Sequence, residues 1–357
     1  DMEAQQAQAP RTATVEFTGN AGEYFKIWIV NIALTVITLG IYSPWAKVRK
    51  LRYFYGNTSI EDGHFDYHAK PTAILIGRII AVGMLFAYYL LSQYEPVAGL
   101  VLITIVVLLI PVLVVRANVF QFRNTSYHGL RFNFQRNYKD SFIVFYGGVL
   151  IALLSLGLAV PSVIYMRNKF VANNAGYGQT QFEFGGRQGE FYAIFWKSVG
   201  LALLGVIGIM LITGGLGAAL GAVADGAPGE SGPAVQAITI LTVLPLFAFY
   251  AAIGIYVQTR QRNYVWNSTT LGGNSFESNL SVRSMVFIQL SNAAAIVLSL
   301  GLLIPWAQVR LARYRAEHMT VQLADDWREY IAAKDSQGSA LGEEVGEAFD
   351  VEVEFAF

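Results

Sequence analysis

The sequence of 357 residues lacks cysteine altogether and is poor in charged residues, which make up 14% of the chain. The absence of cysteine excludes disulfides, thiolate metal sites and cysteine nucleophiles. Apolar residues account for 54% of the chain, and the mean hydropathy of +0.43 is high for a soluble domain of this size. The composition therefore indicates an integral membrane protein.

Common catalytic motifs are also missing. The chain contains no Gly-x-Ser-x-Gly, no phosphate-binding Gly-Lys-Ser/Thr and no His-Glu-x-x-His. His64 and His68 lie on either side of Asp66, but in a strand they are far apart and no further ligand completes a metal set. We therefore expect no enzyme, no metal or cofactor site and no nucleic-acid partner.

The charges are distributed unevenly, although 25 cationic and 25 acidic residues cancel. Residues 317–357 carry 2 Lys/Arg and 11 Asp/Glu, so the preceding body is basic. We interpret residues 334–357 as an acidic solvated tail, with docking on a basic cytoplasmic face as the alternative. Residues 1–13 are interpreted as a disordered N-terminus, because they lack the apolar core of a signal peptide. A single membrane domain, residues 14–333, lies between them.

Two long stretches of the chain contain no Lys or Arg. One lies between Arg78 and Arg116 and the other between Lys197 and Arg260, and each holds two apolar runs of membrane-spanning length. Each stretch therefore predicts a transmembrane helical hairpin. Because the connecting turns also lack cations, the positive-inside rule places both turns outside the cytoplasm. The predicted hairpins are residues 72–116 and 191–257.

Three further apolar segments are interrupted by a Leu-Gly pair followed by proline. Glycine weakens a helix and proline removes a backbone donor, so each segment is expected to break. The segments are 25–46, 141–163 and 284–305. The residues expected at the breaks are Gly40, Pro44, Gly157, Pro161, Gly301 and Pro305.

Cations flank each broken segment on both sides. If all three segments crossed the bilayer, the basic loops 166–190 and 258–283 would lie outside the cytoplasm, against the positive-inside rule. If each segment instead enters, bends at Leu-Gly and returns, every basic stretch and the C-terminus stay cytoplasmic. We therefore favour three re-entrant segments, with full crossings that give seven helices as the alternative.

The first and third broken segments align without a gap at an offset of 261 residues. Asn31 matches Asn292, and Pro44-Trp45-Ala46 matches Pro305-Trp306-Ala307. The middle segment has Gly148 where the others have Asn and Ser162 where they have Trp. This pattern indicates an internal repeat.

A basic, aromatic stretch with a short alternating end occurs five times along the chain. Alternation of Phe or Tyr with polar residues is typical of a strand, so we expect short cytoplasmic strands, either separate or joined into a small sheet. The predicted fold class is accordingly an all-α integral membrane protein with two hairpins, three broken segments and these short strands. The five stretches are 49–67, 116–134, 167–184, 260–276 and 310–323.

The run Thr38-Leu39-Gly40-Ile41-Tyr42-Ser43-Pro44-Trp45-Ala46-Lys47-Val48-Arg49, followed by Asn57-Thr58 and Phe65-Asp66-Tyr67, is quite specific. It resembles the YjgN-like family of bacterial inner-membrane proteins, a family of unknown function. The resemblance covers about residues 14–357. It implies a multi-pass protein of the bacterial cytoplasmic membrane and supplies no catalytic residues.

Cations near the ends of the apolar segments are candidate ligands for anions. Guanidinium groups pair with phosphate oxygens, so these side chains could bind anionic lipid headgroups or a phosphorylated ligand. The alternative is that they only snorkel to the interface and fix the topology. The candidates are Arg49, Arg52, Arg78, Arg116, Arg167, Lys197, Arg260, Arg310 and Arg313.

Asn31 and Asn292 lie at matched depth in two broken segments, where an amide prefers a hydrogen-bond partner. They either pack together or line a polar path between broken helices, and broken helices in repeated copies are typical of transport sites. The first hypothesis is a transporter or channel for an anionic or lipid-like substrate. The alternative is a non-transporting scaffold that binds anionic lipids or partner proteins.

Overall fold

The computed structural model describes residues 11–224 and 233–323 of the chain. Within these residues, ten strands form a closed antiparallel barrel in the order β1-β10-β9-β8-β7-β6-β5-β4-β3-β2, and β1 also pairs with β2. The strands are β1 Arg11–Phe17, β2 Thr58–Ile60, β3 Gly63–Tyr67, β4 Thr125–Tyr127, β5 Leu130–Phe134, β6 Ala175–Tyr177, β7 Thr180–Phe184, β8 Thr269–Leu271, β9 Asn274–Ser278 and β10 Met319–Leu323.

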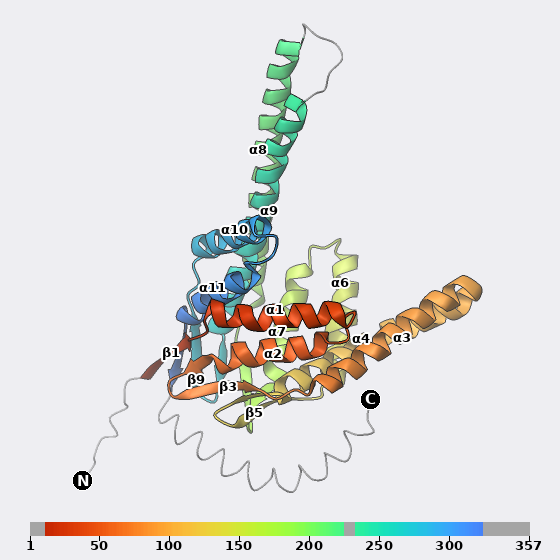
Figure 1. Cartoon of the computed structure of the whole chain (residues 1–357), viewed down its shortest axis with the longest axis vertical. Coiled ribbons are helices and arrows are strands. Elements are labelled where there is room, and N and C mark those ends of the chain that lie inside the picture. The colour runs from red at the N-terminus through yellow and green to blue at the C-terminus, as the bar shows by residue number, and fades with distance from the viewer. Residues whose placement is uncertain (1–10, 225–232, 324–357) are drawn as a thin grey trace.

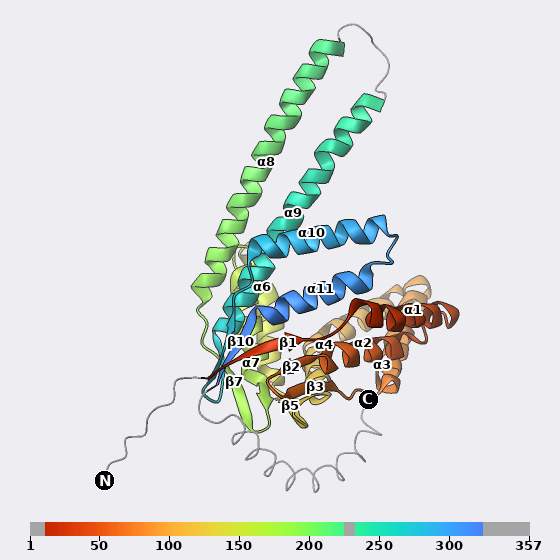
Figure 2. The ribbon, with the colours of Figure 1, turned by 60° about the vertical axis from the view of Figure 1, so that its left-hand side comes forward.

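Helical hairpins make every second connection between neighbouring strands, joining β1 to β2, β3 to β4, β5 to β6, β7 to β8 and β9 to β10. Because neighbouring strands run in opposite directions, these hairpins all leave from the same end of the barrel (Figures 1 and 2). The helices are α1 Ala21–Ile37, α2 Ser43–Gly56, α3 Pro71–Tyr94, α4 Pro96–Arg123, α5 Tyr138–Phe142, the π-helix η1 Ile143–Gly147, α6 Gly148–Leu154, α7 Val160–Asn174, α8 Gln188–Ala224, α9 Pro233–Asn267, α10 Val282–Leu298 and α11 Ile304–Glu317.

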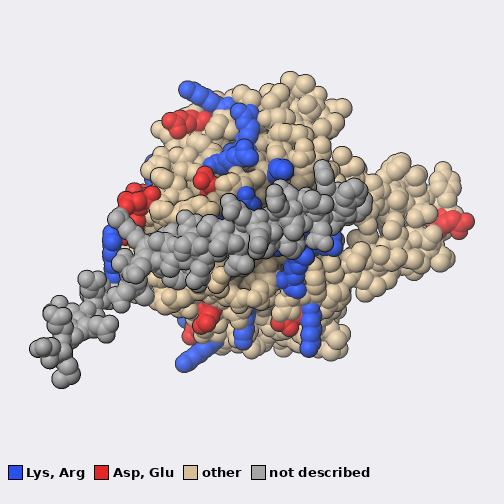
Figure 3. Space-filling model, turned by 90° about the horizontal axis from the view of Figure 1, so that it is seen from below, with Lys and Arg blue, Asp and Glu red and all other residues tan. Residues whose placement is uncertain are grey.

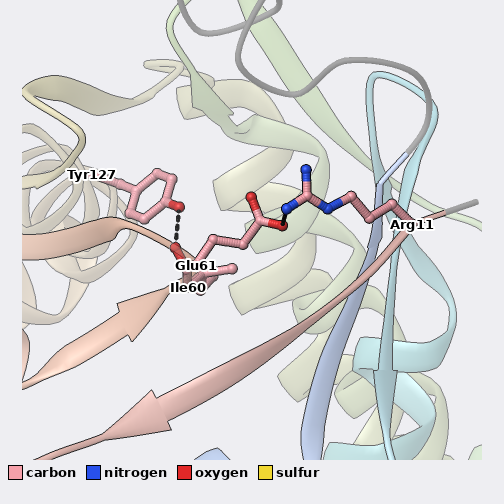
Figure 4. Close-up of polar contacts among 4 residues, drawn as sticks. All are labelled: Arg11, Ile60, Glu61 and Tyr127. Carbon is pink, nitrogen blue, oxygen red and sulfur yellow. Dashed lines mark hydrogen bonds and ion pairs between the residues drawn. The ribbon is translucent and has the colours of Figure 1, made fainter.

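The opposite end of the barrel is formed by two-residue turns. Glu61, His128, Gly178 and Gly272 open these turns with positive φ angles of 51°, 49°, 59° and 54°. Such turns match the right-handed twist of antiparallel strands. At this end a guanidinium nitrogen of Arg11 lies 2.9 Å from Oε1 of Glu61, which ties β1 to the β2–β3 turn (Figure 4). Strand β1 thus begins inside the segment that we interpreted as disordered, residues 1–13.

Four of the described helical stretches are long and apolar enough to span a bilayer. At most 11% of the most apolar window of each is buried within the protein, as expected for surfaces that lipid covers. They coincide with the predicted hairpins and confirm a membrane protein with transmembrane helices. The pair α3–α4 and the pair α8–α9 project from the barrel in different directions (Figure 1). The stretches are Pro71–Tyr94, Pro96–Arg123, Gln188–Ile212 and Val243–Asn267.

Each of the three broken segments folds as a short helical hairpin whose two ends both join the barrel. The chain reverses at the Leu-Gly pair, where Leu39, Leu156 and Leu300 have φ angles of 51°, 52° and 51° and the following glycines have φ of 92°, 87° and 92°. A proline is then the second residue of the second helix of each hairpin. The leucines at the tips are 93–95% exposed. Whether these apolar tips dip into a membrane remains a prediction.

The all-α fold class predicted from the sequence is wrong, because the described chain contains the closed ten-stranded barrel. The expected strands are present, but they form a barrel rather than separate strands or a small sheet. Each strand has only three to seven residues, so no single strand produces a strong β pattern. The predicted acidic tail, residues 334–357, lies outside the described residues.

Candidate ligand site in the barrel

The inside of the barrel forms an open cavity of about 620 Å³ to which every strand contributes at least one side chain. Each of the five odd-numbered strands places a phenylalanine on its wall. Neighbouring rings in this belt are 5.9–6.5 Å apart between centroids, from Phe65 through Phe132 and Phe182 to Phe276. We call these residues the phenylalanine belt: Phe17, Phe65, Phe132, Phe182 and Phe276.

Two tyrosines of the barrel strands, Tyr127 and Tyr177, contribute to the same wall without making it polar. The hydroxyl of Tyr127 donates to the carbonyl oxygen of Ile60 at 2.8 Å, as Figure 4 shows. The hydroxyl of Tyr177 donates to the carbonyl oxygen of Tyr127, also at 2.8 Å. Because backbone acceptors bind both hydroxyl groups, the rings present apolar surface to the cavity.

Two arginines interrupt this apolar lining at the end of the barrel from which the helices leave. Arg262 lies near the end of α9 and Arg315 near the end of α11. The Nε of Arg315 is buried and has no hydrogen-bond partner within residues 11–224 and 233–323. Burial and the neighbouring charge of Arg262 lower the pKa of Arg315 to about 10, so its guanidinium is still charged at neutral pH.

A second cavity, of about 460 Å³, adjoins the first on the helix side of the barrel. It is lined by polar side chains of α7 and α9, among them Asn168, Gln258 and Gln261. Arg262, Trp266 and Arg315 line both cavities and therefore mark their boundary. Among the described residues, no Asp or Glu lines either cavity.

Together the two cavities form an amphiphilic site. An apolar chamber lies inside the barrel, two like charges lie at its mouth, and polar side chains lie beyond them. The buried Nε of Arg315 is stabilised when an anion accepts its hydrogen bond, and the neighbouring guanidinium groups of Arg262 and Arg315 repel each other until an anion is bound. The chemistry of the site therefore fits a molecule with an apolar part and an anionic group.

Asn31 and Asn292, which were predicted to lie at matched depth, each contact the facing helix of their own hairpin. In the first hairpin, Asn31 Nδ2 lies 3.5 Å from the carbonyl oxygen of Ala46, and an Arg49 nitrogen lies 3.5 Å from Asn31 Oδ1. In the third hairpin the equivalent distances are shorter: 3.2 Å from Asn292 to Ala307 and 3.0 Å from Arg310 to Asn292. We call each arrangement an Asn–Arg lock. Each asparagine thus pairs across its own hairpin.

The other predicted cations have separate positions. Arg78, on α3, donates to the hydroxyl of Ser43 beside the first Leu-Gly turn. Arg52 and Arg313 donate to the carbonyl oxygens of Tyr67 and Gly19, at 3.1 and 3.0 Å. The remaining four are exposed side chains on α4, α7, α8 and α9, namely Arg116, Arg167, Lys197 and Arg260.

Neither cavity is lined by any cation, asparagine, glycine or proline that the sequence analysis selected. Arg262 and Arg315 were not among the predicted residues, and each follows a predicted arginine, Arg260 or Arg313, by two positions. On a helix, side chains two positions apart point to nearly opposite sides. A signal was present, because both missed arginines lie in the last turns of a helix that leads directly into a strand.

Four apolar helices of membrane-spanning length define the chain as an integral membrane protein. It matches a family described as "Bacterial protein of unknown function (DUF898)" over residues 12–348, and it belongs to that family. This membership confirms the resemblance noted from the sequence.

Two similar relatives are each named "Inner membrane protein YjgN". The one from Salmonella typhimurium is 37% identical over 123 residues, which are 34% of this chain and 31% of the relative. The one from Escherichia coli strain K12 is 32% identical over 139 residues, which are 38% of this chain and 35% of the relative. The match thus spans about a third of the length of these curated relatives. No solved structure matches the chain.

Proposed function

We propose that this membrane protein is a transporter for an anionic, lipid-like substrate, which it binds in the barrel cavity. The observation that carries the proposal is the pair Arg262 and Arg315 at the mouth of an apolar chamber, with no carboxylate lining either cavity among the described residues. Ligand sites are typically concave and mostly apolar, with a few polar groups that fix orientation. A lipid-like anion satisfies both parts of this lining.

The position of the site next to the membrane helices supports transport. All five described helical hairpins leave the barrel at the end where the two arginines lie, and the polar cavity lies among α7, α9, α10 and α11. The face seen from below, away from the tip of α8–α9, carries lysines and arginines interspersed with several acidic side chains (Figure 3). In the proposed topology this face, the barrel and the C-terminus are cytoplasmic, and the three Leu-Gly tips enter the bilayer.

A second candidate function is a non-transporting scaffold that binds anionic lipids. Its supporting observation is that two of the three broken hairpins are held by Asn–Arg locks. In addition, neither cavity is lined by Gly40, Gly157 or Gly301, where a transport path through the breaks would run. In this case the cations beside the hairpins bind headgroups at the membrane surface and the barrel does not carry substrate.

Transbilayer movement of a labelled lipid distinguishes the two functions. The full chain is reconstituted into phosphatidylcholine vesicles that contain NBD-labelled phosphatidylglycerol or lysophosphatidylglycerol, and external dithionite then bleaches only the exposed label. A transporter moves at least one anionic probe from the inner to the outer leaflet, where dithionite then bleaches it as well. An Arg262→Gln, Arg315→Gln double variant loses this activity. The matched control, Arg260→Gln with Arg313→Gln, keeps it. If neither probe moves although the protein is inserted in the vesicles, the transport proposal is wrong and the scaffold is favoured.

A further inference from the structure

The size of the barrel cavity limits the substrate. A methylene group occupies about the same volume as a water molecule, roughly 30 Å³. The cavity of about 620 Å³ therefore has room for about 20 groups of this size. This is enough for one acyl chain of ordinary length, whereas the two chains of a membrane phospholipid need about twice the space.

The chemistry of the wall fits one acyl chain. The phenylalanine belt surrounds the cavity, and Leu271 and Val321 fill the wall between its rings. Each methylene that moves from water into such surroundings contributes about 0.8 kcal/mol. Resting on the transport function above, we propose that the barrel binds a single-chain anionic amphiphile, with its anionic group at Arg262 and Arg315 and its chain inside the phenylalanine belt.

The two arginines fix the orientation of this ligand. Both line the boundary between the apolar and the polar cavity, so the anionic group lies on the helix side and the chain points toward the two-residue turns. The Nε of Arg315, which has no partner in the described part of the chain, donates to a carboxylate or phosphate oxygen. Any further polar part of the headgroup contacts Asn168, Gln258 and Gln261 in the second cavity.

Trp266 provides a direct probe of the orientation because its indole lines both cavities beside the arginines. The full chain in a non-ionic detergent is titrated with stearate that carries bromine either near the carboxylate or near the methyl end. The difference in tryptophan emission between the unmodified chain and a Trp266→Phe variant gives the signal of Trp266. The head-side bromine is expected to quench Trp266 more strongly than the tail-side bromine. Equal quenching, or stronger quenching by the tail-side bromine, overturns the orientation.

Competition against this brominated ligand tests the chemical class. Palmitate and 16-carbon lysophosphatidylglycerol are expected to displace it, while lysophosphatidylcholine, dipalmitoyl phosphatidylglycerol and inorganic phosphate displace it at least about tenfold more weakly. Affinity for fatty acids should rise about fourfold per added methylene, the equivalent of 0.8 kcal/mol, and level off once the cavity is full. The affinity of fatty acids that bind only in the lipid or detergent layer around the helices should not level off at a particular chain length.

Variants separate this inference from the transport function. The double change Arg262→Gln, Arg315→Gln should weaken palmitate binding at least about tenfold, because charge-assisted hydrogen bonds are lost. The neighbouring pair Arg260→Gln, Arg313→Gln should leave it within about twofold. If dipalmitoyl phosphatidylglycerol competes as well as palmitate and is also transported, the single-chain proposal is wrong and the transporter stands. If neither pair of changes alters the affinity for palmitate, the proposed site is wrong.

Discussion

The first and third broken hairpins differ from the middle one in how their two helices are joined. The outer two use the Asn–Arg lock, in which a buried asparagine contacts a carbonyl oxygen and an arginine of the facing helix. In the middle hairpin the three equivalent positions are Gly148, Val163 and Met166. A side-chain Cβ at Gly148 would lie only 2.9 Å from Cγ1 of Val163. The helices therefore meet there through apolar packing without an equivalent amide.

This difference shows that the turn and the contact between helices are separate features of the hairpin. All three hairpins have the same positive φ angles at Leu-Gly, so the backbone reversal does not depend on the lock. The three contact positions change together: asparagine, alanine and arginine in two hairpins, and glycine, valine and methionine in the other. A small residue faces a larger one in both versions, which keeps the helices close together.

The largest effect is expected from removing the Asn–Arg lock of the third hairpin, which has the shorter contact distances. Asn292 is 6% exposed, so Asn292→Ala leaves a buried carbonyl oxygen and a partly buried guanidinium without this partner. The free energy of unfolding in detergent should fall by about 2 kcal/mol. In the control Asn292→Asp, the carboxylate still accepts from Arg310, and the loss should be smaller. Equal losses for both variants would show that the arginine contact contributes nothing.

A smaller loss is expected when the middle hairpin is overpacked. Gly148→Ala places a methyl group against Val163, at a cost of about 2 kcal/mol that the better helix propensity of alanine offsets by about 1 kcal/mol. The adjacent Gly147→Ala is the matched control, because the nearest atom to its added Cβ is 3.9 Å away. Adding Val163→Ala to Gly148→Ala should restore stability in the same unfolding assay. If it does not, steric contact is not what joins these helices.

The smallest effect is expected from removing the Asn–Arg lock of the first hairpin, which has the longer contact distances. Asn31→Ala breaks two contacts of 3.5 Å each, which is near the limit for a hydrogen bond. The expected loss is about 0.6 kcal/mol, the average for polar contacts between membrane helices. Unfolding of this variant and of Asn292→Ala should be measured side by side under identical conditions. An Asn31→Ala loss as large as that of Asn292→Ala contradicts the ranking by distance.

Much of the local structure was predictable from the sequence. Cation-free apolar runs identify α3, α4, α8 and α9 because the cost of burying a charge in lipid is large. The Leu-Gly-x-x-x-Pro spacing identifies the three breaks, because glycine tolerates positive φ and proline suits the start of a helix. Alternating aromatic residues identify the strands, since side chains along a strand point to opposite faces.

Barrel closure and the candidate ligand site were not predictable in the same way. Closure requires β1 to pair with β10, and no local pattern records that contact between distant segments. The phenylalanine belt has one ring on each of five separate strands, so it appears only once the barrel is closed. Arg262 and Arg315 were not predicted, because the charge pattern does not show which of two arginines two positions apart faces the barrel.

The pairing of Arg11 with Leu323 has a consequence for biosynthesis. A ribosome releases the first strand long before the last, and the membrane helices between them emerge in the meantime. The edge of β1 that pairs with β10 therefore stays without its partner strand until β10 has been synthesised. The barrel becomes a continuous ring only after the helical hairpins that precede β10 have been synthesised, so its cavity is complete only at the end of translation of this region.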